Sequence, residues 1–184
     1  MGNPDKEGTV SNALADVYQK EATAAGHEVR RANLGDLSFD PILHKGYKVI
    51  QQLEPDLLKV QEDMKWADHF VLVYPLWWSS VPALLKGFFD RIFIPGFAFH
   101  FHKDGMMWDK LLKGKTARVI ILSKSWPIVL RTFFGDFTNE VSRALLGFAG
   151  YRVHLMEIGN SEHLSPEKLS VWEHKVGALA RKGK

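Results

Sequence analysis

The sequence contains no cysteine, which excludes disulfide bonds and thiolate chemistry and fits a reducing compartment. Its longest uninterrupted apolar run, FVLVYPLWW, is far shorter than the ~20 residues that a membrane-spanning helix needs. The N-terminus lacks the basic-then-apolar pattern of a secretory signal. We therefore expect a cytoplasmic protein without a membrane span.

Strong charge and familiar catalytic motifs are also lacking. The formal net charge is only +3, and no basic block or interleaving of basic and aromatic residues favours nucleic-acid binding. There is no Gly-x-Ser-x-Gly, no Gly-rich loop before Lys-Ser/Thr, and no His-Glu-x-x-His. A chain without an evident nucleophile favours a bound cofactor as the source of any chemistry.

What the sequence does contain is an alternation of strand and helix patterns over its whole length. This alternation predicts a single α/β domain over residues 1–184, with a parallel sheet covered by helices on both faces. The predicted strands are residues 27–34, 68–75, 116–123 and 151–159, and the predicted helices are residues 10–26, 54–67, 81–93, 137–150 and 165–182.

The pattern leaves one strand unaccounted for. The first twelve residues, MGNPDKEGTVSN, are typical of the loop and helix start that follow a central first strand, yet only Met1 and Gly2 precede them. We expect the strands that end near Leu34 and Tyr74 to lack their shared neighbour. Either the sequence starts late or something else fills the position.

Polar residues gather where the first helix begins: Asn3, Thr9, Ser11 and Asn12. Free backbone N–H groups and the helix dipole favour a phosphate at such a place. The same residue types are equally typical of simple helix capping, which the residues alone favour.

A tryptophan pair follows the strand 68–75, at the carboxyl edge of the sheet where α/β folds bind ligands. Broad apolar side chains and backbone amides suit a planar heteroaromatic ring there. The residues that form this rim are Pro75, Leu76, Trp77, Trp78 and Ser79. The alternative is that one tryptophan is core and the other covers a dimer surface. More than half of all aromatic residues lie between Trp66 and Trp108, which favours a pocket or an interface over a single core.

Two further segments are candidates. Residues 97–102 alternate with period 2, placing His100 and His102 on one face, where either histidine could donate a proton to a substrate. Without a second ligand cluster we predict no metal site. After the strand 116–123, the loop is expected to face the same ligand edge, although an ordinary loop is the simpler interpretation. Its candidate residues are Ser123, Lys124, Ser125 and Trp126.

Four stretches together resemble the flavodoxin-like NAD(P)H:quinone reductases, including bacterial modulators of drug activity. These are GNPDKEGTVSNALADVY, LGDLSFDPIL, WADHFVLVYPLWWSSVPALLKGFFDRIFIPGFAF and LLKGKTARVII. The resemblance implies a three-layer fold with strand order 2-1-3-4-5, a bound flavin (FAD, with FMN as the alternative) and a homodimer with its active site at the interface. The flat object beside the tryptophan pair is then an isoalloxazine ring.

The resemblance also implies roles for residues. The loop Pro75–Ser79 matches the segment that holds the ring, and Thr9, Val10, Ser11 and Asn12 match the segment that binds the flavin phosphates. Phe99 and Phe101 match aromatics on the substrate side, where we also expect Trp126. Two departures stand out: Asn3 replaces the histidine that usually follows the first strand, and SKSWP replaces a Thr-Thr-Gly-Gly type loop.

The activity implied is ping-pong hydride transfer, in which NAD(P)H reduces the flavin and leaves before a quinone takes the hydride from the same face. Reduction of azo or nitro compounds at the same site is a second enzymatic possibility. A non-catalytic flavodoxin-like regulatory or interaction protein is the alternative from another class, favoured by the altered SKSWP loop.

Overall fold

The computed structural model describes residues 1–103 and 105–184. The helices are α1 Val10–Ala24, α2 Pro55–Trp66, α3 Ala83–Ile92, α4 Pro127–Phe134, α5 Pro166–Ala180 and a π-helix, Glu140–Gly147. The strands are β1 His69–Pro75, β2 Phe99–Phe101, β3 Trp108–Lys110, β4 Thr116–Leu122 and β5 Arg152–Ile158.

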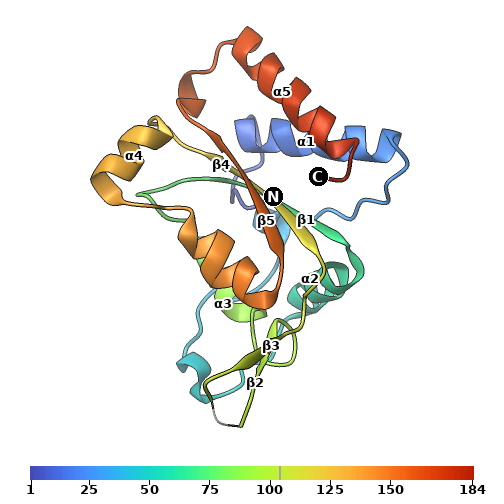
Figure 1. Cartoon of the computed structure of the whole chain (residues 1–184), viewed down its shortest axis with the longest axis vertical. Coiled ribbons are helices and arrows are strands. Elements are labelled where there is room, and N and C mark those ends of the chain that lie inside the picture. The colour runs from blue at the N-terminus through green and yellow to red at the C-terminus, as the bar shows by residue number, and fades with distance from the viewer. Residues whose placement is uncertain (104) are drawn as a thin grey trace.

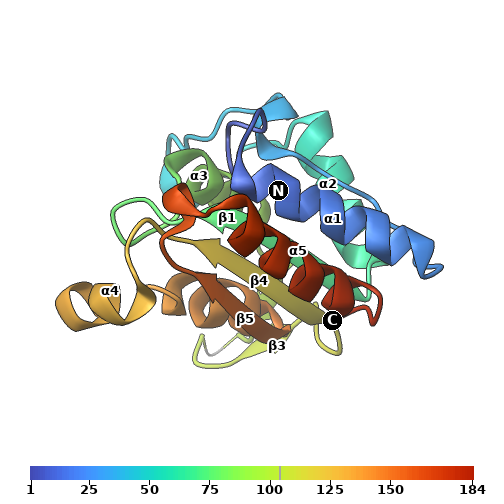
Figure 2. The ribbon, with the colours of Figure 1, turned by 90° about the horizontal axis from the view of Figure 1, so that it is seen from above.

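A three-layer α/β/α arrangement confirms the predicted fold class (Figures 1 and 2). The central sheet has the order β1-β4-β5, all parallel, and β2 and β3 form a separate antiparallel hairpin. Side chains alternate between the two faces of the sheet. On one face Val73, Ile120 and Ile158 pack with α1 and α5. On the other, Leu72 and Val119 pack with α2, α3 and the π-helix.

Residues 27–33 carry no strand, although the pattern predicts one at 27–34. The reason lies in the neighbourhood of this segment. A strand needs a partner to form a ladder, and the position between this segment and β1 holds only the first two residues of the chain. The three strands of the central sheet, β1, β4 and β5, correspond to the last three strands of the order 2-1-3-4-5 that the resemblance implies.

Helix α4 is a second difference. The segment after β4 was expected to be a loop, but residues 127–134 form a helix with Pro127 in its first turn, a position that proline favours. None of its residues is buried, and Figure 2 shows it standing away from the body of the molecule. Leu130 is partly buried against the hydrophobic core, whereas Ile128, Phe133 and Phe134 are exposed.

Candidate functional site

Three loops meet at the carboxyl edge of the sheet. Pro75 and Leu122 are paired neighbours at the ends of β1 and β4, so the loops that follow them leave the sheet side by side. The N–H of Gly2 donates to the carbonyl of Val73 at 2.7 Å, which brings the loop before α1 to the same edge. Figure 2 shows these loops at the end of the sheet toward which the β4 arrow points. The edge thus unites the three segments predicted to hold a flavin.

The tryptophan pair lies in a strained turn. Trp77 and Ser80 exchange backbone hydrogen bonds of 3.0 Å each, and between them Trp78 and Ser79 have φ values of 50° and 57°. Two consecutive positive φ angles are usual only with glycine, asparagine or aspartate, because a Cβ makes this conformation costly. The Trp78 side chain, at 102% exposure, touches nothing that would repay that cost. Strain held at an exposed aromatic is typical of a ligand-binding site.

Polar contacts fix this turn to its neighbours. The hydroxyl of Ser80 donates to Oε2 of Glu140 at 2.9 Å, which joins the turn to the π-helix, and the N–H of Leu76 donates to Leu122 at 2.7 Å. Beneath the turn, the buried Tyr74 hydroxyl has no partner within the described part of the chain. Burial first, and then the carboxylates of Glu140 and Glu157, raise the pKa of Tyr74, so its proton is retained.

The loop after β4 is held by backbone contacts. The Ser123 side chain is buried and its hydroxyl donates to the Ser125 carbonyl at 2.8 Å, so it faces the protein and not a ligand. Both the N–H and the hydroxyl of Ser161 donate to the Ser123 carbonyl. Lys124 and Glu162 form an exposed ion pair at 3.0 Å, which adds little stability but holds the lysine at this edge. Trp126 is exposed beside them.

The loop before α1 caps the helix and leaves backbone N–H groups of the first turn without a partner in the helix. Oγ1 of Thr9 accepts from the Asn12 N–H at 3.2 Å, so the capping interpretation is confirmed. Asn3 is buried, with its side-chain amide 3.5 Å from the Ser11 hydroxyl. The N–H groups of Val10 and Ser11, in the first turn, have no carbonyl in their own helix to bind. They are the donors that an anion would use.

Glu140, Ser161 and Glu162 were missed by the sequence reasoning. The role of Glu140 could not be predicted from local pattern, because its hydrogen-bond partner Ser80 lies sixty positions earlier in the sequence. The loop after β5 offered a clearer signal. It follows a predicted strand at the carboxyl edge, as the two recognised loops do, and it contains the polar residues Asn160 and Ser161.

The aromatic and histidine residues of 99–102 lie at the opposite edge. Helix α3 runs back from the carboxyl edge, and the β2–β3 hairpin follows it, just before β4 begins. A seven-residue strand spans about 23 Å, so Phe99 and Phe101 are far from the tryptophan turn of their own chain. Phe99 instead packs against Phe101 and Phe148, with centroids 5.0 and 5.1 Å apart. His100 is exposed, and Nε2 of His102 lies 3.1 Å from Asp109.

Neither a metal site nor a membrane span is found in residues 1–103 and 105–184. No three His, Cys, Asp or Glu side chains there are grouped to hold a metal ion. No helix in the same part of the chain is long and apolar enough to cross a bilayer. A cavity of about 420 Å³ is present, but it lies between α1, α2 and β1, and none of the predicted site residues lines it.

The carboxyl edge fits a flavin by its donor set. A flat ring with polar edges finds the exposed faces of Trp77 and Trp78 and the outward backbone of a strained turn. A phosphate finds the first-turn amides of α1, a 15-residue helix with no acidic residue in its first turn. The groups at the carboxyl edge therefore match a flavin in two respects: they offer the contacts that its ring and phosphate need, and they lie at the same edge of the sheet.

Comparisons with known proteins agree with this geometry. A family model described as "Flavodoxin-like fold" matches residues 1–154. The ribosyldihydronicotinamide dehydrogenase [quinone] of Homo sapiens is 33% identical over 181 residues, with 93% of this chain and 77% of that protein covered. Its counterpart in Rattus norvegicus is 31% identical over 184 residues, with the same coverage.

Among solved structures, the NAD(P)H:quinone oxidoreductase from Methanothermobacter marburgensis has a TM-score of 0.78 at 21% identity, covering 97% of this chain and 93% of its own. An FMN-dependent NADH-azoreductase from Bacillus anthracis, in complex with FMN, has a TM-score of 0.71 at 22% identity, covering 98% and 95%. These two likenesses show the fold. Together with the family match and the sequence relatives, they establish that the chain belongs to the flavodoxin-like family of NAD(P)H:quinone reductases.

Proposed function

We propose that this protein is a flavin-dependent NAD(P)H:quinone oxidoreductase. The observation that carries the proposal is the Trp77–Ser80 turn, where strain and a fully exposed tryptophan are maintained at the ligand edge of the sheet. Its sequence relatives are named ribosyldihydronicotinamide dehydrogenase [quinone], which supports the same reaction class.

The ring-binding residues are proposed to be Pro75, Leu76, Trp77, Trp78 and Ser79. Trp77 and Trp78 supply apolar faces, and the turn amides supply hydrogen bonds to a polar ring edge. The loop 123–126 closes the neighbouring side, with Lys124 offsetting negative charge and Trp126 facing the substrate. Thr9, Val10, Ser11 and Asn12 receive the phosphate end, with Asn3 beneath them. When bound, the cofactor supplies hydride uptake from NAD(P)H and hydride delivery to the acceptor.

FAD is the proposed flavin, and FMN is the second candidate. Both have the same ring and first phosphate, so the loops described above serve either. Acid extraction of the purified protein followed by chromatography separates the two directly. A solved azoreductase of the same fold is described as FMN-dependent, which makes this measurement necessary.

A homodimer is proposed for two reasons: an apolar surface is exposed on α4, and the proposed substrate-side aromatics lie far from the tryptophan turn of their own chain. Ile128, Phe133 and Phe134 on α4 are 69–75% exposed, and Trp78 and Trp126 continue the apolar surface at the same edge. Phe99 and Phe101 cannot reach the turn of their own chain, but a second copy related by a two-fold axis can present its hairpin there. His100 or His102 of that copy would then supply the proton that a reduced quinone requires.

The chain itself positions and shields the reactants, and no residue forms a covalent bond with substrate. Burial keeps the proton on Tyr74, so Tyr74 is not a base for the reaction, and Glu140 positions the turn by accepting the hydrogen bond from Ser80. Donor and acceptor share one ring face and cannot bind together. Initial rates at several quinone concentrations should therefore give parallel double-reciprocal lines.

The decisive experiment is a visible spectrum of the purified protein, followed by NAD(P)H oxidation with a quinone. Absorbance bands near those of free flavin and quinone-dependent NAD(P)H oxidation are the expected results. A colourless protein whose tryptophan fluorescence does not change on FAD or FMN titration would refute flavin binding. A flavin-loaded protein without NAD(P)H oxidation would support the non-catalytic alternative.

A further inference from the structure

Basic side chains gather at the amino edge of the central sheet, opposite the proposed flavin site. His69, Arg118 and His154 lie near the starts of β1, β4 and β5, and the register makes Arg118 a direct neighbour of His154. Because side chains on a strand alternate between faces, all three lie on the face that packs with α1 and α5. A seven-residue strand spans about 23 Å, so this basic cluster is separate from the carboxyl edge.

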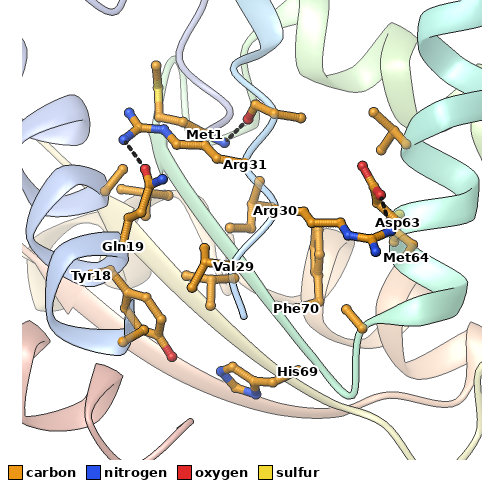
Figure 3. A pocket seen from close by; sticks show the side chains of 18 of the residues that line it. Met1, Tyr18, Gln19, Val29, Arg30, Arg31, Asp63, Met64, His69 and Phe70 are labelled. Atoms are coloured by element: carbon orange, nitrogen blue, oxygen red, sulfur yellow. Dashed lines mark hydrogen bonds and ion pairs between the residues drawn. The ribbon is translucent and has the colours of Figure 1, made fainter. Parts of the chain in front are cut away.

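Tyr18 of α1 forms one wall of the basic cluster. Its buried ring lies parallel to the His69 imidazole, with a centroid distance of 6.4 Å and an angle of 17° between the planes. Figure 3 shows the two rings next to each other at one end of the cavity. The Tyr18 hydroxyl donates to the Lys184 carbonyl at 3.2 Å. His27, which follows α1, lines the same cavity, with Nε2 at 3.3 Å from the Arg181 carbonyl.

Two buried nitrogens of the cluster have no hydrogen-bond partner in residues 1–103 and 105–184. They are Nε2 of His69 and Nε of Arg118. Nδ1 of His69 lies 2.7 Å from Oγ1 of Thr116, and when that hydroxyl donates, the imidazole proton is on Nε2. Both nitrogens are then donors. Buried donors are nearly always satisfied by protein, water or a ligand, so these two indicate a missing acceptor.

The charge of Arg118 also lacks a counterpart. Within the described parts of the chain, neither it nor His27, His69 or His154 forms an ion pair with a carboxylate side chain. Burial lowers the pKa of Arg118, which means that its charge is incompletely solvated. Burial first, and then the charges of Arg118, His154 and His27, lower the pKa of His69 to about 4. An anion among these groups would relieve both effects.

Simple exposure of the arginine head does not explain this arrangement. A long cationic side chain often lays its stem on apolar surface and keeps the whole charged group in water. Here Arg118 is half-buried and its Nε is out of reach of solvent. His154, its neighbour on β5, is exposed, so the cluster stays open to solvent on that side.

We propose that the basic cluster binds a small inorganic oxyanion of the phosphate or sulfate type. Arg118 supplies the positive charge, and its guanidinium donors match two oxygens of a tetrahedral anion. Nε2 of His69 donates from the floor of the site, beside the Tyr18 ring. His27 and His154 lie at its rim, where their protonation adds to the attraction. The site is independent of the proposed flavin phosphate site, which uses the first turn of α1 at the other edge.

Thermal unfolding with phosphate and with sulfate tests the proposal, against sodium chloride at the same ionic strength. At about ten times Kd, either anion should raise the melting temperature by roughly 3–6 °C over chloride. Arg118→Met should abolish this rise and should be no less stable than the unchanged protein in chloride, because it removes an unpaired cation. The matched control is Arg143→Met, which removes an exposed arginine on the opposite face of the sheet and should keep the full response.

Histidine side-chain NMR locates the bound anion. The Nε2 resonance of His69 should shift with the same Kd as the melting response, while exposed His44 and His163 should not. Arg118→Lys keeps the charge but loses the Nε donor, so its Kd should rise at least about 10-fold; this variant also serves if Arg118→Met does not fold.

Other results contradict the proposal. Equal melting temperatures in phosphate, sulfate and chloride, or an unshifted His69, would show that the cluster binds no anion. A rise that persists in Arg118→Met and disappears with excess FAD would place the phosphate at the flavin site. Tighter binding of glycerol phosphate than of inorganic phosphate would mean that the cluster takes a phosphate ester and not the free ion.

Discussion

Replacement of Trp78 separates the stability of the turn from its affinity for flavin. The side chain is fully exposed and its φ is 50°, so Trp78→Gly loses no packing and relieves a conformation that costs an L-residue about 1–2 kcal/mol. The greater conformational freedom of glycine in the unfolded chain reduces this gain in stability by roughly 0.5–1 kcal/mol. Trp78→Ala is the matched control, because it removes the same ring and keeps the Cβ. The glycine variant should therefore be more stable than the alanine variant by about 0.5–1 kcal/mol.

Flavin affinity should fall in both variants by the same amount. An aromatic side chain buries roughly 150–250 Å² when it is fully covered, and a ring stacked on one face covers about half of that. At about 25 cal/mol per Å², the loss is ~2–3 kcal/mol, or roughly 30- to 150-fold in Kd. Urea unfolding of the apoprotein gives the stability difference, and fluorescence titration with FAD and FMN gives the affinity.

Two results would refute this reasoning. If the glycine and alanine variants unfold at the same urea concentration, the positive φ is not a source of strain. If a folded Trp78→Ala protein binds flavin as tightly as the unchanged protein, the ring does not contact the cofactor. The residue then belongs to the dimer surface alone.

Three further predictions follow from other contacts. Phe133→Asp on the exposed face of α4 should convert a dimer into a monomer near 20.9 kDa by light scattering, and an unchanged dimer would place the interface elsewhere. Ser80→Ala removes and Glu140→Gln weakens the same hydrogen bond, so each variant should lower flavin affinity by about 1 kcal/mol, and the double variant should lower it by no more. Additive losses of affinity would mean that the two residues act separately. Burial first, and then the charge of Arg118, lower the pKa of His69 to about 4, so the folded protein binds fewer protons than the unfolded chain between that value and 6.5. Stability should therefore fall as the pH is lowered through this window, and His69→Gln should show a smaller fall in urea titrations at pH 7 and pH 4.5.

Much of the fold was readable from local pattern. The apolar runs of β1 and β4 predict strands because both faces of an interior parallel strand are buried, and the structure confirms them. The predicted strand β5 is also present, but it lies at the edge of the sheet and Ile158 is its one buried residue. Residues 27–33 failed as a strand, although their pattern is suitable. The pattern records which residues suit a ladder, but the ladder itself depends on a neighbour.

The candidate site was predictable in part. The position of the Trp77–Ser80 turn followed from its place after a buried strand, whereas its positive φ angles are invisible in a sequence that puts tryptophan and serine there. Ser123 was expected to face a ligand, but its hydroxyl serves the Ser125 carbonyl. Whether a serine hydroxyl bonds to the protein or faces a ligand depends on the geometry of its loop, which the residue types alone do not determine.

The π-helix Glu140–Gly147 joins the tryptophan turn at one edge of the sheet to the β2–β3 hairpin at the other, and it fixes the orientation of its two end contacts relative to each other. At its start, Glu140 accepts from Ser80 of the tryptophan turn, and just after its end Phe148 stacks on Trp108 with a centroid distance of 4.4 Å. The wider turns, in which the Phe148 N–H reaches back five residues to Arg143, set the rotation between these two contacts. Loss of one residue from this helix would tighten it to ordinary pitch and turn Phe148 about 100° away from its partner. The length of this helix therefore sets the angle between the Ser80 contact and the Trp108 contact. Substitutions within the helix should be tolerated more readily than insertions or deletions.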